Sequence, residues 1–324
     1  MTKSLITVFG GTGFLGRHTI RALAKAGHRI RVAVRFPHEG FFLPPMGTVG
    51  QIALLRCNVR EADEVAAEVA GADAVINLTG ILYQRGEQSF EAVHVEAAEI
   101  IAKAAKAAGA KTLVHVSAIG ADKDAEALYA SSKGEGEERV RAAFPEAAIV
   151  RPSLVFGPED DFFNRFAGLA RVLPLLPLIG GGHTKFQPVF VGDVAAVIAK
   201  LVQDPALGCK TYEIGGPTVF TFKELMQVVL KETGRKRLLL PVPFALATLK
   251  AMFLQFLPKP LLTPDQVTLL KSDNIVTGEN GLTALGIAPT SVEAEVPTYL
   301  WRFRPKGQYA ESVADRVSAA PAPQ

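Results

Sequence analysis

Hydrophobic and polar positions follow two alternating patterns over the first two thirds of the chain. Short runs rich in β-branched residues, bounded by polar or glycine-containing segments, are typical of strands. We predict strands near residues 5–9, 29–35, 52–58, 73–79, 112–117 and 147–151. Helical segments lie between them, and the clearest is the Ala-rich stretch 89–108 before Gly109. This alternation predicts an α/β fold with a doubly wound parallel sheet.

Two of the runs place particular strands in that sheet. Ala74-Val75-Ile76-Asn77-Leu78 is apolar almost throughout, as a central parallel strand covered on both faces should be. A later run, Thr211-Tyr212-Glu213-Ile214, is expected to return to the same sheet. The sheet therefore extends beyond the six strands of the first half.

A glycine-rich turn, Gly10-Gly11-Thr12-Gly13-Phe14-Leu15-Gly16, follows the first strand and opens a helix that ends near Gly27. In such turns the first glycine permits the tight turn, the second lets the backbone approach a pyrophosphate, and the third lets helix and strand pack closely. The helix N-terminus also offers free N–H groups to phosphates. The turn predicts a Rossmann-type nucleotide site that includes Gly10, Thr12, Gly13, Phe14, Leu15 and Gly16.

The end of the second strand indicates which nucleotide binds. Sites for NAD usually carry Asp or Glu there, to accept hydrogen bonds from the ribose 2′-hydroxyl. This chain has Arg35, and no acidic residue comes before Glu39. A guanidinium suits a 2′-phosphate, so NADPH is favoured and NADH remains an option. Alternatively, Arg35 is only a solvated residue of an edge strand.

The texture of the sequence changes after about Gly157, where prolines become frequent and loops lengthen. This change predicts a second, smaller α/β lobe built from the C-terminal part of the chain. The boundaries we expect are a nucleotide-binding domain at 1–157, completed by about 186–216, a smaller lobe at 158–185 and 217–311, and a disordered tail at 312–324.

Further segments follow the order of a known family. Asn58-Val59 comes after the third predicted strand, Leu78-Thr79-Gly80 ends the fourth, and Tyr129 precedes Lys133 by four residues. Together with the glycine turn and Arg151-Pro152-Ser153-Leu154-Val155-Phe156-Gly157, they resemble the extended and atypical short-chain dehydrogenase/reductases from residue 5 to about 216. The resemblance implies cofactor contacts from Asn58, Val59, Leu78, Thr79, Gly80, Val116, Tyr129, Lys133, Pro152, Ser153 and Val155.

The catalytic set of that family is present only in part. Tyr129 and Lys133 share a helical face, and in the family the lysine lowers the tyrosine pKa so that the phenol acts as general acid or base. Active relatives carry a second Ser or Thr after the position of Ser117, whereas this chain has Ala118. Unless Ser117 or Ser153 substitutes, the donor that polarises a substrate carbonyl is missing. Tyr129, Lys133 and Ser117 are therefore residual or vestigial catalytic candidates.

Three more segments narrow the resemblance: Ala143-Phe144-Pro145-Glu146-Ala147, Phe156-Gly157-Pro158-Glu159-Asp160 and Gln187-Pro188-Val189-Phe190-Val191-Gly192-Asp193-Val194. They are similar to the nucleotide-binding accessory subunits of respiratory complex I (NADH:ubiquinone oxidoreductase) and their bacterial relatives. That resemblance implies NADPH held as a structural component without turnover, with other complex I subunits as partners. The alternative is a free-standing NADPH-dependent reductase, or an epimerase or dehydratase, acting on a nucleotide sugar or a quinone-like carbonyl.

Composition changes this picture little. A formal net charge of +3 gives no electrostatic footprint for nucleic acid, and the six histidines show no metal-ligand spacing. Cys57 and Cys209 are expected to be buried thiols in a reducing compartment. The first strand begins almost at the N-terminus, without a signal peptide, so we expect a cytoplasmic protein or a processed mature form.

Residues 233–264 contain no Asp or Glu, and they hold the basic residues Arg235, Lys236, Arg237, Lys250 and Lys259. The apolar run Phe244–Leu257 inside this window is too short to span a bilayer, which needs ~20 residues. It is either an ordinary buried helix or a helix that faces an anionic membrane or a membrane-bound partner. The second option, with the narrower resemblance, implies a peripheral position at the cytoplasmic face of the inner membrane, or the matrix side in a mitochondrion.

Overall fold

A computed structural model describes residues 4–258 and 260–307. Seven strands form one parallel sheet in the order β11-β6-β5-β4-β1-β2-β3. Their bounds are β1 Leu5–Phe9, β2 Arg29–Val34, β3 Ile52–Arg56, β4 Ala74–Asn77, β5 Thr112–Val116, β6 Ala148–Pro152 and β11 Thr211–Ile214. The predicted doubly wound sheet is confirmed, and the strand at Thr211–Ile214 returns to it beside β6.

Side chains of the sheet point alternately to its two faces, and each face has its own core. Val8, Val32 and Ile76 belong to one buried apolar cluster, whereas Phe9 and Val75 belong to another. Every residue of β4 is buried, as the apolar run there predicts for a central parallel strand. The sheet is therefore covered on both sides.

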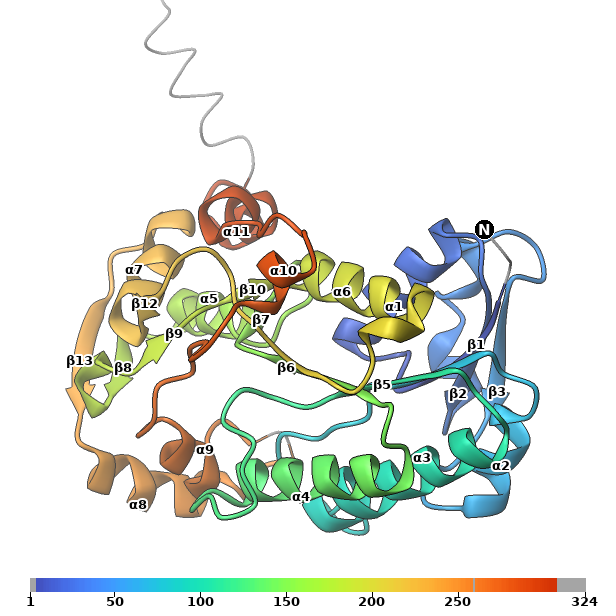
Figure 1. Cartoon of the computed structure of the whole chain (residues 1–324). Coiled ribbons are helices and arrows are strands. Elements are labelled where there is room, and N and C mark those ends of the chain that lie inside the picture. The colour runs from blue at the N-terminus through green and yellow to red at the C-terminus, as the bar shows by residue number, and fades with distance from the viewer. Residues whose placement is uncertain (1–3, 259, 308–324) are drawn as a thin grey trace, which may run out of the picture.

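Five helices provide that cover (Figure 1). α1 (Phe14–Lys25) and α6 (Val191–Gln203) pack together on one face. α2 (Ala62–Val69), α3 (Ala97–Ala107) and α4 (Leu128–Ala143) lie on the other face. The helix predicted over 89–108 is present, but its first turns, Glu91–Glu96, are π-helical. Such π-helical turns often mark functional sites, and the sequence pattern did not predict this one.

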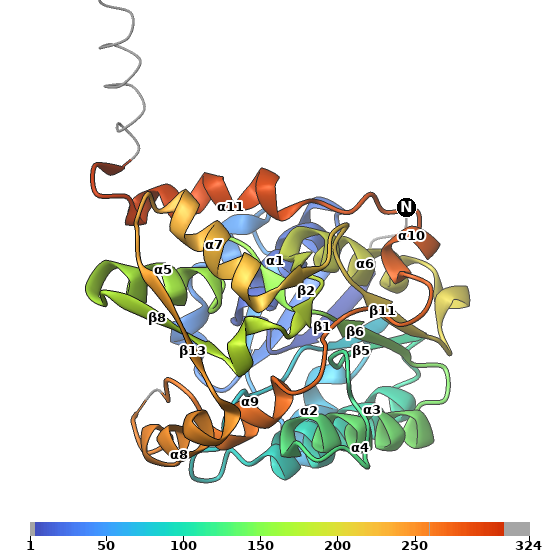
Figure 2. The ribbon, with the colours of Figure 1, turned by 90° about the vertical axis from the view of Figure 1, so that its left-hand side faces the viewer.

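The remaining elements form what we call the distal group, which faces the viewer in Figure 2. Its helices are α5 (Phe163–Val172), α7 (Phe222–Glu232), α8 (Phe244–Leu254), α9 (Pro264–Leu269) and α11 (Val292–Leu300). Its longer strands are β8 (Leu175–Ile179) and β13 (Leu238–Val242), which pair in parallel. Short strands and one short helix connect the distal group to the sheet: β7 Val155–Phe156, β9 Lys185–Phe186, β10 Val189–Phe190, β12 Phe220–Thr221 and α10 Gly281–Ala284.

Aromatic side chains fill the core of the distal group. Phe156, Phe163 and Phe222 are buried there beside Leu176 and Val296. Because this cluster is separate from the two cores of the sheet, the distal group has packing of its own. The domain boundaries expected from the sequence remain a prediction, and the expected tail at 312–324 lies outside the described residues.

The structure corrects the burial expected for one cysteine and decides between the two alternatives for the apolar run that forms α8. Cys57 is buried, and burial raises the pKa of its thiol to about 12, but the prediction for Cys209 was wrong because that residue is exposed. Cys209 sits in the turn before β11 with a φ of 61°, a position that the apolar neighbourhood in the sequence does not reveal. For α8 the buried-core alternative is also wrong, since only Ala247 and Ala251 of the helix are buried.

Candidate functional site

The glycine turn between β1 and α1 is closed by its own backbone. Gly10 has a φ of 78°, and a Cβ on it would lie 2.9 Å from the Leu78 carbonyl carbon. A Cβ on Gly16 would lie 2.5 Å from the carbonyl oxygens of Gly10 and Gly11. Only glycine fits these two positions, because one needs left-handed backbone and the other a close helix–turn contact.

Gly13 differs from the other glycines of the turn. A Cβ there would meet only the Gly10 carbonyl oxygen, at 3.4 Å, which is ordinary contact. The space above Gly13 is therefore open on the side away from the protein. Gly13 is also the residue before α1, and no side chain caps this helix end. An open cradle at the positive end of a helix dipole fits a bound phosphate group.

Arg35 follows β2 at the same edge of the sheet. Its side chain is exposed, its guanidinium carbon lies 6.0 Å from the ring centre of Phe36, and among the described residues it forms no hydrogen bond or ion pair. The connection after β2 returns to the glycine turn, since a Cβ on Gly40 would lie 3.2 Å from Cγ2 of Thr12. An unpaired cation thus lies at the strand end that is adjacent to the turn.

The ends of β3 and β4 contribute short polar turns. Asn58 donates its backbone N–H to Glu64 at 2.6 Å, and its Oδ1 accepts from the backbone of Arg60 at 3.3 Å. Val59, next to it, packs against the core of one sheet face. After β4, Asn77 Oδ1 accepts from the backbone and hydroxyl of Thr79, at 3.0 and 2.6 Å. These bonds fix the direction in which each segment leaves the sheet.

Tyr129 and Lys133 lie on α4, beside the Leu78-Thr79-Gly80 segment. Lys133 is buried, its Nζ donates to the Val116 carbonyl at 3.3 Å, and a Cβ on Gly80 would lie 3.3 Å from that Nζ. Burial lowers the pKa of Lys133 to about 8, against the opposing charge of Glu137. Burial raises the pKa of Tyr129 to about 12, so the phenol keeps its proton at neutral pH.

The two serines that could replace the missing hydroxyl differ in their surroundings. Ser117 follows β5, is buried, and its Oγ has no hydrogen-bond partner in the described part of the chain. Ser153 is occupied, because its hydroxyl lies 2.8 Å from Oδ1 and 2.9 Å from the carbonyl oxygen of Asn274. Ser117 is therefore the free hydroxyl of the two, and Ala118 offers none.

The Arg151–Gly157 segment supports α4 from the sheet. The Arg151 guanidinium donates to both carboxylate oxygens of the buried Glu137, each at 2.8 Å. Paired geometry of this kind gives a strong, oriented contact between β6 and α4. Pro152 ends β6, and Val155 begins β7, which pairs with β10 outside the seven-stranded sheet.

Two buried histidines near Lys133 were missed by the sequence reasoning. Ile81 donates its backbone N–H to His94 Nε2 at 3.0 Å, which leaves the proton on Nδ1, 2.9 Å from Ser132 Oγ. His115 Nδ1 lies 3.1 Å from Asn77 Nδ2. Burial lowers the pKa of His94 to about 2 and that of His115 to about 3. No local pattern distinguishes these residues from core positions, so no sequence signal could have found them.

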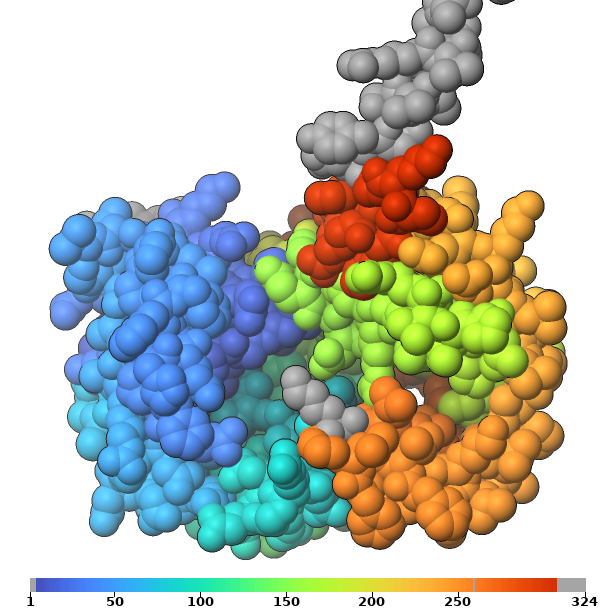
Figure 3. All heavy atoms as spheres, turned by 180° about the vertical axis from the view of Figure 1, so that it is seen from behind, coloured from blue at the N-terminus to red at the C-terminus, as the bar shows by residue number. Residues whose placement is uncertain are grey.

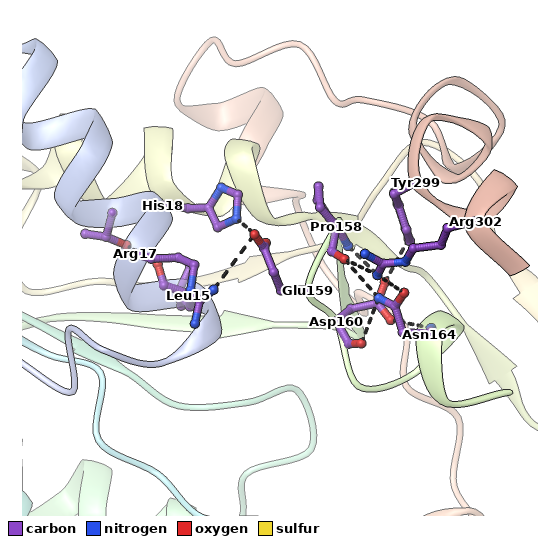
Figure 4. Close-up of polar contacts among 11 residues, drawn as sticks. Leu15, Arg17, His18, Pro158, Glu159, Asp160, Asn164, Tyr299 and Arg302 are labelled. Atoms are coloured by element: carbon purple, nitrogen blue, oxygen red, sulfur yellow. Dashed lines mark hydrogen bonds and ion pairs between the residues drawn. The ribbon is translucent and has the colours of Figure 1, made fainter. Parts of the chain in front are cut away.

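A loop after β7 connects α1 to the distal group (Figure 4). Glu159 contacts His18 of α1 at 3.2 Å and Arg17 at 3.8 Å. The next residue, Asp160, is buried and accepts from the Tyr299 hydroxyl of α11 at 2.7 Å. Burial raises the pKa of Asp160. Helix α1, which follows the glycine turn, and helix α11 are thus linked through two adjacent carboxylates.

The space-filling view shows one face of the molecule (Figure 3). A hollow separates the blue N-terminal residues from the green and orange atoms of the distal group (Figure 3).

In the described residues, no group of three or more His, Cys, Asp or Glu side chains could hold a metal ion. Over the same residues, no helix is long and apolar enough to cross a bilayer.

Comparison with known proteins adds to this geometry. Residues 6–215 match the model of the NAD dependent epimerase/dehydratase family. The chain is similar to the mitochondrial NADH dehydrogenase (ubiquinone) 1 alpha subcomplex subunit 9 of Arabidopsis thaliana, with 36% identity over 96% of this chain and 81% of the relative. It is also similar to the ceramide reductase of Caulobacter vibrioides, with 33% identity over 74% of each chain.

A solved structure agrees with the fold. The NADPH-dependent quinone oxidoreductase of Escherichia coli, determined with NADPH, superposes with a TM-score of 0.74 and 20% identity. The match covers 91% of this chain and 99% of that protein. At this level of identity the likeness concerns the arrangement of helices and strands.

Proposed function

Because this chain belongs to the NAD dependent epimerase/dehydratase family, we propose that it binds a nicotinamide dinucleotide over the turn Gly10–Gly16 and prefers NADPH to NADH. The preference is supported by Arg35, which is exposed, unpaired among the described residues and not accompanied by an acidic residue at the end of β2. A guanidinium there can bind a 2′-phosphate, which NADH lacks.

The role that we propose is an accessory subunit of respiratory complex I, in which NADPH is held and not turned over. This role is supported by similarity to alpha subcomplex subunit 9 over almost the whole chain. It is also supported by Ala118, which removes a hydroxyl donor, and by the engagement of Ser153 with Asn274. The expected partners are the other subunits of that complex.

The chain's own residues would hold the nicotinamide end in this proposal. When bound, NADPH supplies a hydride-donating ring. The Lys133 ammonium would donate to the ribose hydroxyls, and the Tyr129 phenol, which keeps its proton, would hydrogen-bond the same ribose. Ser117 could still donate to a nearby carbonyl, since its hydroxyl is unpartnered within the described chain. The described residues thus offer more contacts that hold the cofactor than groups that transfer a proton to a substrate.

Purification from the native membrane tests the role. Tagged protein should co-purify with the large multi-subunit complex and should release NADPH on denaturation in near-equal molar amount. Protein recovered only as a lone species, with or without nucleotide, would contradict the accessory role.

A second candidate is a free-standing reductase that acts on a lipid carbonyl. It is favoured by the similarity to ceramide reductase and by the presence of both Tyr129 and Lys133 on one face of α4. This candidate predicts NADPH oxidation with a long-chain ketone and its loss in Tyr129→Phe. The accessory role predicts no such oxidation.

Both candidates would place the protein at a membrane, and residues 233–264 are the surface that we propose for this contact. Large apolar side chains of α8 and the residues after it remain exposed: Leu249 by 54%, Phe253 by 73% and Phe256 by 82%. Helices with such faces lie in membrane interfaces, and basic residues strengthen the attraction to anionic lipid. The resulting position is peripheral, at the cytoplasmic face of the inner membrane or the matrix side in a mitochondrion.

The basic residues of this surface are not equivalent. Arg237 donates to the Ala170 carbonyl at 2.8 Å and Arg235 to the Phe303 carbonyl at 3.2 Å, so both hold the distal group together. Lys236 and Lys250 are exposed and have no ion pair in the described part of the chain. Lys259 lies outside the described residues. The two lysines are therefore the positions at which charge can be removed without loss of structure.

Vesicle binding tests the surface. Protein should bind vesicles that contain phosphatidylglycerol at low salt and release as salt rises, because Debye screening acts within ~8 Å at physiological salt. Lys236→Gln with Lys250→Gln should weaken binding about tenfold, at ~1 kcal/mol or less per basic residue. The matched control, Lys25→Gln with Lys111→Gln, removes the same charge elsewhere and should bind as wild type. If both double variants lost vesicle binding equally, net charge alone would explain the effect.

A further inference from the structure

The first turn of α4 lacks a cap of its own. Ala127 precedes the helix and offers no side-chain acceptor to the free N–H groups of that turn. The acceptor comes from α9 instead. Asp265 accepts from the Leu128 N–H through Oδ1 at 2.6 Å and from the Tyr129 N–H through Oδ2 at 3.1 Å. One carboxylate of the distal group therefore caps the helix that carries Tyr129 and Lys133.

Asp265 is free to act on α4 because α9 has another cap. Thr263 Oγ1 accepts from the Gln266 N–H at 3.2 Å, and Gln266 Oε1 accepts from the Thr263 N–H at 3.2 Å. These reciprocal bonds satisfy the start of α9 without its aspartate. The Asp265 carboxylate is thus presented to a second helix.

The position of α9 is itself fixed by packing. Val267, two residues after Asp265, is fully buried against Ala247 and Ala251 of α8. Figure 1 shows α9 between α8 and the start of α4. The short helix α9 therefore connects the exposed helix α8 to the first turn of α4, which carries Tyr129.

We propose that Asp265 is a positioning residue of the nucleotide site. It holds the first turn of α4 so that Tyr129, and Lys133 one turn later, stand where the nicotinamide ribose binds. A negative charge at a helix N-terminus also stabilises the helix through its dipole. The inference rests on the nucleotide binding proposed above, and it adds a residue of the distal group, 136 positions away from Tyr129, to that site.

Two nucleotides distinguish positioning from general stability. In the proposed site, NADPH would reach α4 with its nicotinamide half, whereas 2′,5′-ADP would occupy only the adenosine half near Arg35. Asp265→Ala should raise the dissociation constant of NADPH about 2- to 30-fold, the range for loss of a helix cap, and leave that of 2′,5′-ADP within twofold. Asp265→Asn retains one acceptor oxygen and should fall between wild type and alanine.

Ser291 provides the matched control. It caps α11, where its Oγ accepts from the Ala294 N–H at 3.2 Å, and it belongs to the same distal group without touching α4. Ser291→Ala should leave both dissociation constants unchanged. Amide hydrogen exchange offers a second readout, since Leu128 and Tyr129 should exchange faster in Asp265→Asn than in wild type.

The outcomes separate this inference from the proposal beneath it. The positioning role alone would be overturned if Asp265→Ala weakened the binding of both nucleotides equally. It would also be overturned if a folded variant with faster amide exchange bound NADPH as tightly as wild type. Wild-type protein that binds neither nucleotide would overturn the proposed function and this inference with it. A wild type that binds 2′,5′-ADP as tightly as NADPH would show that α4 contributes nothing to binding.

Discussion

His94 Nδ1 lies 2.9 Å from the Oγ of Ser132, and this contact fastens the π-helical turns before α3 to the helix that carries Lys133. The other ring nitrogen accepts from the backbone of Ile81, in the segment after β4. One imidazole therefore connects two parts of the proposed nucleotide site. The bond from Ile81 requires the ring to be neutral, because a protonated imidazole has no acceptor left for the Ile81 N–H, whereas the Nδ1–H can donate to Ser132 in either state.

Stability should consequently fall in acid. The folded-state pKa values of His94 and His115 are lowered to about 2 and about 3, from 6.5. Below pH 6.5 the unfolded chain binds more protons than the folded chain, so the free energy of unfolding decreases as pH falls. The two groups together should remove about 2–3 kcal/mol between pH 7.5 and 5.5. Urea denaturation across this range measures it.

His94→Gln serves as the control for that series. It should be less stable than wild type at pH 7.5 and should show a shallower decline toward pH 5.5, since one titrating group is gone. Identical slopes for the variant and wild type would mean that His94 is not a source of the acid sensitivity.

Nucleotide binding should weaken in alkali. Burial lowers the pKa of Lys133 to about 8, so its ammonium is present below that pH and is lost above it. If the ammonium holds the ribose, NADPH affinity should drop up to about tenfold per pH unit above 8. Binding of 2′,5′-ADP, which in the proposed site would not reach Lys133, should stay level. A Lys133→Met variant should bind NADPH weakly and equally from pH 7 to 9, as fluorescence titration can establish.

Removal of Arg35 should separate the two cofactors. Arg35→Ala should cost NADPH ~1.5–3 kcal/mol, the range for a hydrogen bond to a charged group, and should change NADH little. Arg29→Ala is the matched control, because Arg29 begins β2 whereas Arg35 follows its last residue, and the substitution removes the same charge. Gly13→Val should abolish binding of both nucleotides, since its side chain would fill the open space above the turn. Equal losses of NADPH and NADH in Arg35→Ala would contradict the assignment.

The fold was predictable from the sequence because each element is encoded locally. Strand runs such as 29–35 and 112–117 agree with β2 and β5 to within a residue at each end. The glycine turn was equally visible, since its spacing is fixed by sterics over seven residues. The partners of α4 were not predictable. Asp265 and Tyr129 are 136 residues apart, and nothing in either neighbourhood marks the pair.

The exposure of α8 shows a different limit. Its sequence is apolar on almost every side, so periodicity cannot say which face is covered. The structure shows that α8 contacts α9 with its small residues and leaves Leu249 and Phe253 exposed. The sequence also could not tell which basic residues beside α8 are exposed and which have structural partners. In the structure Arg235 and Arg237 bind backbone carbonyls, whereas Lys236 is exposed.

Ala118 permits a direct test of whether the site has lost a reaction. It follows Ser117 at the end of β5, where a second hydroxyl would polarise a substrate carbonyl in active members of the family. Wild-type protein with NADPH should not reduce phenanthrenequinone or a long-chain ketone. Ala118→Ser should produce a slow but measurable oxidation of NADPH, because one such donor contributes ~100- to 1,000-fold in rate.

The double variant Ala118→Ser with Tyr129→Phe decides how that activity arises. If the restored hydroxyl works with the phenol as proton donor, the double variant should return to the background rate while it still binds NADPH. Activity that persists without the Tyr129 hydroxyl would show that the oxidation is not that of this site. Brisk turnover by the wild type, lost in Tyr129→Phe, would instead make the lipid-carbonyl reductase the better of the two functions, with Ser117 as the remaining donor.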